Sequence, residues 1–139
     1  MTEESDLPED VRAFLRLRIE SHEQLELLQL LQREPARRWS PKELGERLHL
    51  SPELAEVEAQ ALAAVGLADG STIESTVHYG YYQADPATKA IVERVLELYH
   101  TQPVQIMKLM STTAIERVRT AALRAFADAF VLKKGPDRG

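Results

Sequence analysis

The chain of 139 residues contains no cysteine, and this absence excludes disulfides, cysteine nucleophiles and thiolate metal sites. No apolar run approaches the length of a membrane span, and the acidic N-terminus lacks the basic start of a signal peptide. The six glycines stand singly at predicted turns, so no glycine-rich loop is available to hold a phosphate. From these absences we expect a cytoplasmic protein without cofactors and without membrane contact.

An excess of basic residues is also missing. The formal net charge is −5 at pH 7, and the pI is about 5.4. Residues 1–70 carry 8 Lys or Arg against 15 Asp or Glu, whereas residues 71–139 carry 9 against 7. This balance is unusual for a protein that binds nucleic acid, because Lys and Arg neutralise the phosphates. Any attraction to DNA must therefore come from a local patch, which the charge balance places near the C-terminus.

The sequence shows no arrangement typical of catalysis or of metal binding. The four histidines, at positions 22, 49, 78 and 100, have no ligand spacing, and no serine lies in a nucleophile elbow. Carboxylate pairs such as Glu93 and Glu97 lie at helical spacing, which a solvated helix face explains better than acid–base catalysis. We therefore predict that the chain is not an enzyme and has no catalytic or metal-binding residues.

Two helices are predicted in the N-terminal part of the chain. The first begins at Leu7-Pro8, and Ser21 is the predicted N-cap of the second, with Gln24 as its capping-box partner. Leucines are so dense between residues 25 and 31 that we expect the second helix to be central and buried on most sides.

The central stretch predicts a strand at Trp39, then helix, turn, helix and a two-stranded ribbon. Ser40-Pro41 and Ser51-Pro52 each place a capping serine before a proline, which is tolerated in the first turn of a helix. Asp69-Gly70 is a turn signal, and the β-prone residues that follow predict a hairpin with its tip near Glu74-Ser75-Thr76. This order of elements is typical of a winged helix-turn-helix domain, whose wing is the hairpin.

The C-terminal part of the chain predicts three further helices. Asp85-Pro86 starts the first, and Thr101-Gln102-Pro103 ends it. A short apolar helix then covers residues 104–110, and Thr113 with Glu116 forms a capping box that starts the last helix.

Together these elements predict a mainly α (α+β) fold, a winged helix-turn-helix with a small β-hairpin wing and extra N- and C-terminal helices. We divide the chain into an N-terminal helical arm (1–20), the winged helix-turn-helix (21–84), a C-terminal helical extension (85–134) and a loose tail (135–139). The sequence contains no internal repeat.

The helix that starts at Pro52 is the one expected to read DNA. Its apolar residues at helical spacing are expected to face the core: Leu54, Val57 and Ala61. The outward positions then include two carboxylates, which oppose phosphate contacts. The candidate contacts to DNA or to a protein partner are Lys42, Ser51, Glu53, Glu56, Gln60, Ser75, Thr76 and His78.

The C-terminal helices offer a candidate dimer or partner surface. Methionine-rich apolar helices adapt to partner surfaces, and they also fill ordinary cores. The residues assigned to this surface are Ile106, Met107, Met110, Phe126 and Phe130.

With these motifs, the chain resembles small bacterial winged helix-turn-helix proteins, the broad class that includes the MarR-like regulators. The resemblance covers residues 21–83, and the segment 126–130 is similar to the C-terminus of a group of bacterial winged-helix proteins of no settled function. The resemblance implies transcriptional regulation through DNA, by a homodimer built from terminal helices.

Two functions from different classes remain open. The first is a transcription-associated regulator with a winged-helix DNA-binding fold, which the usual role of this fold favours. The alternative is a winged-helix protein–protein interaction module, an adaptor or regulator that does not bind DNA, which the acidic reading helix favours. Ligand sensing between the core and the C-terminal helices is a third class, for which the sequence offers no residue signature.

Overall fold

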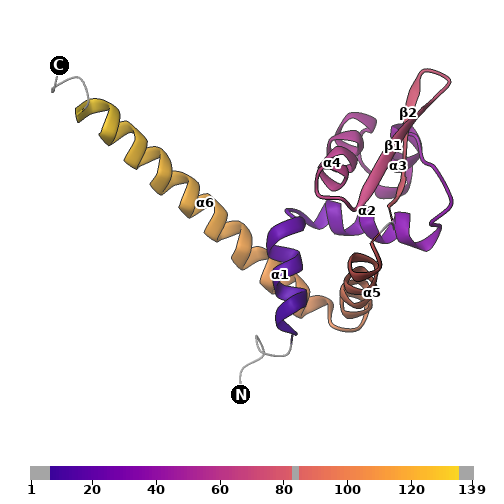
Figure 1. The fold of residues 1–139 in the computed structure, drawn as a ribbon, viewed down its shortest axis with the longest axis horizontal. Coiled ribbons are helices and arrows are strands. Elements are labelled where there is room, and N and C mark those ends of the chain that lie inside the picture. Colours follow the sequence, from indigo (N-terminus) through magenta and orange to yellow (C-terminus); the bar gives the residue numbers. More distant parts are fainter. Residues whose placement is uncertain (1–6, 83–84, 135–139) are drawn as a thin grey trace.

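The computed structural model describes residues 7–82 and 85–134, with side chains up to residue 129, and this part forms six helices and one β-hairpin (Figure 1). The helices are α1 (Glu9–Arg18), α2 (His22–Arg33), α3 (Pro41–Leu48), α4 (Pro52–Ala64), α5 (Pro86–Thr101) and α6 (Pro103–Lys134). The hairpin pairs β1 (Ala68–Ile73) with β2 (Thr76–Tyr81). No helix in these ranges is both long and apolar enough to cross a bilayer. The predicted tail and residues 1–6 of the predicted arm lie outside the described residues.

Helix α2 is the central element of the fold, as its dense leucines predict. It contacts α3, α4 and β2, and Figure 1 shows α5 on its other side. Leu25, Leu27, Leu28 and Leu31 are all fully buried. Burying one such side chain stabilises a fold by roughly 1.5–3 kcal/mol, so these four residues supply a large share of the stability.

A polar cluster joins α2 to α5. The Tyr99 phenol donates to the Glu26 carboxylate, and its oxygen lies 2.6 Å from His22 Nε2. Burial, together with the bond to Glu26, raises the pKa of Tyr99, because ionisation would place two negative charges side by side. The neutral phenol is therefore the form that joins the helices.

Among the described residues, no group of three His, Asp or Glu side chains could hold a metal ion.

Serine caps fix the starts of α2, α3 and α4, as predicted. Ser40 forms a complete capping box: its hydroxyl accepts from Glu43 N at 3.1 Å, and the Glu43 carboxylate accepts from Ser40 N at 2.9 Å. Ser51 Oγ accepts from Leu54 N at 3.1 Å, and an equivalent bond caps α2. These caps satisfy backbone groups that the first turn of a helix leaves without a partner.

The turn between α3 and α4 leaves no room for a side chain on Gly45. His49 ends α3 with a φ of 60°, and Leu50 N donates to Gly45 O at 2.9 Å. A Cβ on Gly45 would lie 2.6 Å from the carbonyl oxygen of Leu50. The two helices therefore meet through a backbone contact that only glycine permits.

The hairpin tip lies where the sequence predicts it. Glu74 and Ser75 have φ angles of 51° and 72°, as in the two-residue type I′ turn that suits a twisted hairpin. The predicted strand at Trp39 is reduced to one bridge, in which Trp39 and Tyr79 exchange two backbone hydrogen bonds of 2.8 Å. The backbone of β2 is thereby joined to the segment that leads into α3.

The predicted turn at Asp69-Gly70 is wrong, because both residues lie inside β1. The Asp69 carboxylate accepts from Arg38 Nη1 at 2.6 Å, and the same guanidinium donates to Ser71 Oγ at 3.0 Å. These contacts lie across the hairpin, where Arg38 also covers Gly80. A long-range ion pair has therefore overridden the local preference of Asp-Gly for turns.

Helix α6 is continuous, and the predicted helix start at Thr113 is wrong. Thr113 is buried within the helix, and the hydroxyl of its neighbour Thr112 donates to the carbonyl oxygen of Lys108 at 3.1 Å. A hydroxyl that bonds four residues back is compatible with a helix interior, so the capping pattern here is not a boundary. The first turns of α6 pack on α1 and α5, whereas residues 118–129 are exposed and extend away from the body (Figure 1).

Replacing Gly45 by alanine should destabilise the fold, although Gly→Ala inside a helix usually stabilises it by up to about 1 kcal/mol. The added methyl meets the carbonyl oxygen of Leu50, and relieving such a contact costs roughly 1–3 kcal/mol. Urea unfolding followed by circular dichroism measures the difference. A midpoint above that of the wild type would contradict the close contact of α3 with α4.

Candidate nucleic-acid interface

Helix α4 turns a different face to the core than its apolar pattern predicts. Ala55, Ala59 and Leu62 are fully buried, whereas Leu54 and Val57 are 42% and 57% exposed. The buried residues are spaced by four and three positions, which places them on one side of the helix. The predicted inward face, which included the two exposed residues, is therefore wrong.

The small side chains on α4 explain this orientation. The helix packs on both α2 and α3, and Gly45 brings the start of α4 to the backbone of α3. Alanine at positions 55 and 59 lets the helices approach closely, whereas leucine or valine there would hold them apart. Close approach thus sets the rotation of α4 about its axis and turns the larger Leu54 and Val57 to solvent.

Glu56 faces the hairpin, contrary to the prediction that it points outward. Its Oε2 accepts a hydrogen bond of 3.1 Å from the Tyr79 hydroxyl on β2, and the carboxylate is partly buried. Burial raises the pKa of Tyr79, so the phenol remains a proton donor well into the alkaline range. Glu56 therefore joins α4 to the wing and is not part of the outward face.

Glu58 is also engaged internally, with α2. Its Oε1 accepts from Gln24 Nε2 at 3.0 Å and lies 3.5 Å from Ser21 Oγ. Gln24 is buried, and its Oε1 accepts from Glu20 N at 2.8 Å, so its amide has partners at both ends. Gln24 bonds Glu20 N rather than the backbone of Ser21, which corrects the predicted capping box. Glu58 is the acceptor that completes this buried network.

The outward face of α4 is consequently almost uncharged. The exposed residues of the helix are Pro52, Glu53, Leu54, Val57, Gln60 and Ala64. Of the three glutamates on the helix, Glu53 is exposed and the other two are partly buried, and the helix contains no lysine or arginine. The face that a groove of DNA would meet therefore presents apolar side chains, the amide of Gln60 and the carboxylate of Glu53.

Four basic side chains lie close to α4 in the sequence: Arg37, Arg38, Lys42 and Arg47. The Arg37 guanidinium stacks 3.6 Å from the ring centroid of Trp39 and pairs with nearby carboxylates, and Arg38 is bound to Asp69. Lys42 and Arg47 are exposed on α3, and within the described ranges neither takes part in an ion pair. They are the cations available for phosphate contacts, although the Arg47 guanidinium also lies 5.0 Å from the Trp39 ring centroid.

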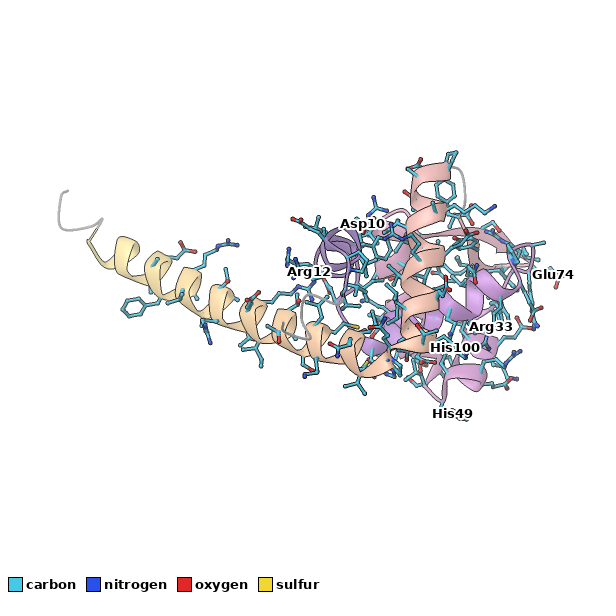
Figure 2. All side chains as sticks on the ribbon, turned by 90° about the horizontal axis from the view of Figure 1, so that it is seen from below. Asp10, Arg12, Arg33, His49, Glu74 and His100 are labelled. Atoms are coloured by element: carbon cyan, nitrogen blue, oxygen red, sulfur yellow. The ribbon has the colours of Figure 1, made fainter. Side chains whose placement is uncertain are left out.

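The candidate residues of the wing lie near its tip. Ser75 and Thr76 are exposed, and His78 is partly buried with Nδ1 placed 3.0 Å from the carbonyl oxygen of Thr76. Glu74 adds a carboxylate there, and Figure 2 shows it at the end of the body opposite the outer half of α6. The candidate Ser51 lies at the start of α4, where its hydroxyl is used as the cap.

Of the candidate partner residues on α6, Phe126 is 72% exposed, and Met107 and Met110 are partly buried. Ile106 is fully buried in the core, so its assignment to a partner surface is wrong. Its position four residues after Gln102 lets it pack inward from the first turn of the helix. The side chain of Phe130 lies outside the described residues.

A mostly apolar stripe runs along α6 from residue 104 to residue 126. Its members are Val104, Met107, Ser111, Ile115, Val118, Ala122 and Phe126. Their spacing of three, four and four residues, repeated twice, keeps them on one side of a helix. Buried Thr113 lies on the opposite side, as does Arg117, which donates to the carbonyl oxygens of Arg16 and Ile19 at the end of α1. The stripe therefore faces away from the body.

Comparison with solved structures shows likeness at the level of the fold. The chain resembles the homodimeric winged helix-turn-helix DNA-binding domain of a possible ArsR-family transcriptional regulator from Mycobacterium bovis. The TM-score is 0.50 and the identity 17%, over 73% of this chain and 92% of that one. It also resembles a mutant of MepR from a multidrug-resistant S. aureus clinical isolate, with a TM-score of 0.50 and 10% identity over 90% of each chain.

No family model and no curated protein matches the chain. The two structural matches nevertheless confirm the class predicted from the sequence: the fold is a winged helix-turn-helix. In that class α3 and α4 are the paired helices, and the β1–β2 hairpin is the wing.

Replacing Glu58 by alanine should cost roughly 1–3 kcal/mol of unfolding free energy, because it leaves the buried amide of Gln24 without its acceptor. The matched change Glu53→Ala, at an exposed position of the same helix, should stay within about 0.5 kcal/mol of the wild type. Urea unfolding of the two variants provides the comparison. Equal losses would show that Glu58 is no more engaged than Glu53.

Proposed function

We propose that the chain is a transcription regulator that binds duplex DNA through α4 and the β1–β2 hairpin. The observation that carries the proposal is the outward face of α4, which is exposed and bordered by glutamates held internally through Tyr79 and Gln24. In this fold the second helix of the pair enters the major groove, and the wing contacts the backbone or the minor groove. The name of the M. bovis neighbour, a DNA-binding domain, supports the same function.

The charges near α4 are compatible with this role once the glutamates are placed. Glu56 and Glu58 do not face the groove, so they oppose phosphate contacts less than the sequence indicates. The first helix of the pair crosses the DNA backbone in helix-turn-helix proteins, and here it carries Lys42 and Arg47. Two available cations per copy support weak binding by one copy, and stronger binding when two copies act on one site.

Changing Lys42 to alanine should weaken binding to every duplex about equally and reduce the slope of log affinity against log salt by about one. The matched control is Lys89→Ala, which removes an exposed lysine from α5, away from α3 and α4. Fluorescence anisotropy of labelled duplexes at about 50 mM and 200 mM salt measures both.

Failure of the wild type to bind random or selected duplexes at either salt concentration would overturn the proposal. It would leave the protein-interaction module as the function of the fold. Equal losses of DNA affinity in Lys42→Ala and Lys89→Ala would show that the DNA contact does not lie on α3.

A homodimer is the second part of the proposal. The stripe on α6 leaves Val104, Ile115, Val118 and Phe126 about 60–70% exposed on the side away from the body. Such a continuous apolar surface is typical of an interface rather than of a solvated helix. The M. bovis neighbour is named as homodimeric, which supports a second copy as the partner.

The stripe is compatible with itself in an antiparallel arrangement. If two copies of α6 cross at Ile115, Phe126 lies opposite the partner's Val104. The same arrangement brings Met107 to within one residue of the position opposite Ala122, and Val118 to within one residue of the position opposite Ser111. Each pair joins a larger side chain to a smaller one, as interdigitating packing requires. A twofold interface of this kind presents the same surface from both copies.

The absence of native cysteine makes this arrangement easy to test. Ile115→Cys should oxidise to a covalent dimer, because the two residues meet at the twofold axis. Thr120→Cys, at an exposed position on the α1 side of the helix, should not. Non-reducing electrophoresis and light scattering give the result. A monomeric wild type, or equal cross-linking of the two variants, would contradict the proposed dimer.

A further inference from the structure

The reading face of α4 has an unusual set of side chains in its first three turns. Leu54, Val57 and Gln60 follow one another at intervals of three residues, and all are exposed. Glu53 precedes them in the first turn. In helix-turn-helix proteins the N-terminal part of this helix contacts the base edges, so these four residues are the ones placed to read sequence.

The chemistry of these side chains selects among the four bases. In the major groove thymine presents a C5 methyl group, which apolar side chains contact, and adenine presents N6 and N7, which pair with an amide. Leu54 and Val57 fit the first, and Gln60 fits the second. Guanine is most often read by arginine or lysine, and α4 contains neither.

Two of the four basic residues near α4 are engaged and do not supply the missing guanine contact, and the other two, Lys42 and Arg47, lie on the helix that crosses the DNA backbone. Arg38 is bound to Asp69 and Ser71, and Arg37 is stacked on Trp39 and paired with carboxylates. The glutamates on the two flanks of the reading face are also engaged. Glu56 accepts a hydrogen bond from Tyr79, and Glu58 accepts one from Gln24 on α2. The face therefore presents two apolar side chains, one amide and the carboxylate of Glu53.

We infer that α4 reads an A·T-rich half-site through thymine methyl groups and adenine, with Leu54 and Val57 contacting the methyls and Gln60 pairing with adenine. The inference rests on the proposed DNA-binding function and names the class of sequence that it recognises. Glu53 accepts a hydrogen bond from cytosine N4 where a C·G pair lies at the edge of the half-site.

The test begins with selection of duplexes from a random library by the wild-type protein. Each thymine of the selected half-site is then replaced by deoxyuridine, which removes the C5 methyl group and leaves every hydrogen-bonding edge unchanged. The loss of a contacted methyl should weaken binding about fourfold, from the transfer free energy of one buried methyl group. Titration of both duplexes by anisotropy gives the thymine-to-uracil ratio at each position.

Three variants assign the contacts. Val57→Ala should bring the thymine-to-uracil ratio at one position close to one, and Gln60→Ala should reduce the preference for adenine at another by about tenfold. Both residues are exposed, and circular dichroism verifies that the variants fold. Lys42→Ala is the matched control, because loss of a phosphate contact lowers affinity for both duplexes and leaves the ratio unchanged.

The outcomes separate this inference from the function on which it rests. DNA binding with a thymine-to-uracil ratio of one at every position, or a selected half-site rich in guanine contacts, overturns the inference and leaves the DNA-binding function intact. Absence of binding to any selected duplex overturns both. The direct contact of Val57 with a thymine methyl group is established if the thymine-to-uracil ratio falls to about one at a single position in Val57→Ala and keeps its wild-type value in Lys42→Ala.

Discussion

The close approach of α4 to α3 and α2 is the constraint on which the rest of the structure depends. Gly45 lets α3 approach the backbone of the turn and of the start of α4, and Ala55 and Ala59 are fully buried further along α4. Once the small residues face inward, the rotation of α4 is fixed. Leu54 and Val57 then take a direction that the packing imposes, and not the direction that their own hydrophobicity favours.

This rotation gives the carboxylates of α4 a structural role. Glu56 and Glu58 lie on the two flanks of the helix, where they accept hydrogen bonds from the hairpin and from α2. Hydrogen bonds to ionised groups are stronger than those between neutral groups, so each glutamate holds a neighbouring element firmly. The acidic sequence of α4 is therefore compatible with an outward face that carries one exposed carboxylate, that of Glu53. The same bonds place the wing at a defined angle to the helix beside it.

The sequence predicts the elements of this fold well and their contacts less well. Serine caps, the leucine-rich α2 and the hairpin tip depend on local preferences, which residues such as Ser40 and Ser51 express directly. The inward face of α4 depends on Ala55 and Ala59, whereas the prediction used the spacing of large apolar residues. The turn predicted at Asp69-Gly70 and the helix start predicted at Thr113 were wrong for a related reason. Arg38 binds Asp69 within β1, and α6 continues through Thr113, so contacts beyond the local sequence decide both. The contact residues on α4 stay a prediction, whereas the outward orientation predicted for Glu56 is wrong.

Trp39 is the single tryptophan of the chain, and it is fully buried where the segment before α3 bonds to β2. Guanidinium groups from Arg37 and Arg47 lie 3.6 and 5.0 Å from its ring centroid, and the second of these belongs to an exposed residue of α3. A cation at this distance polarises the electrons of the indole. Any ligand that draws Arg47 away changes the electric field on the ring. The native chromophore is therefore an intrinsic optical probe of the junction between the paired helices and the wing, and it needs no label.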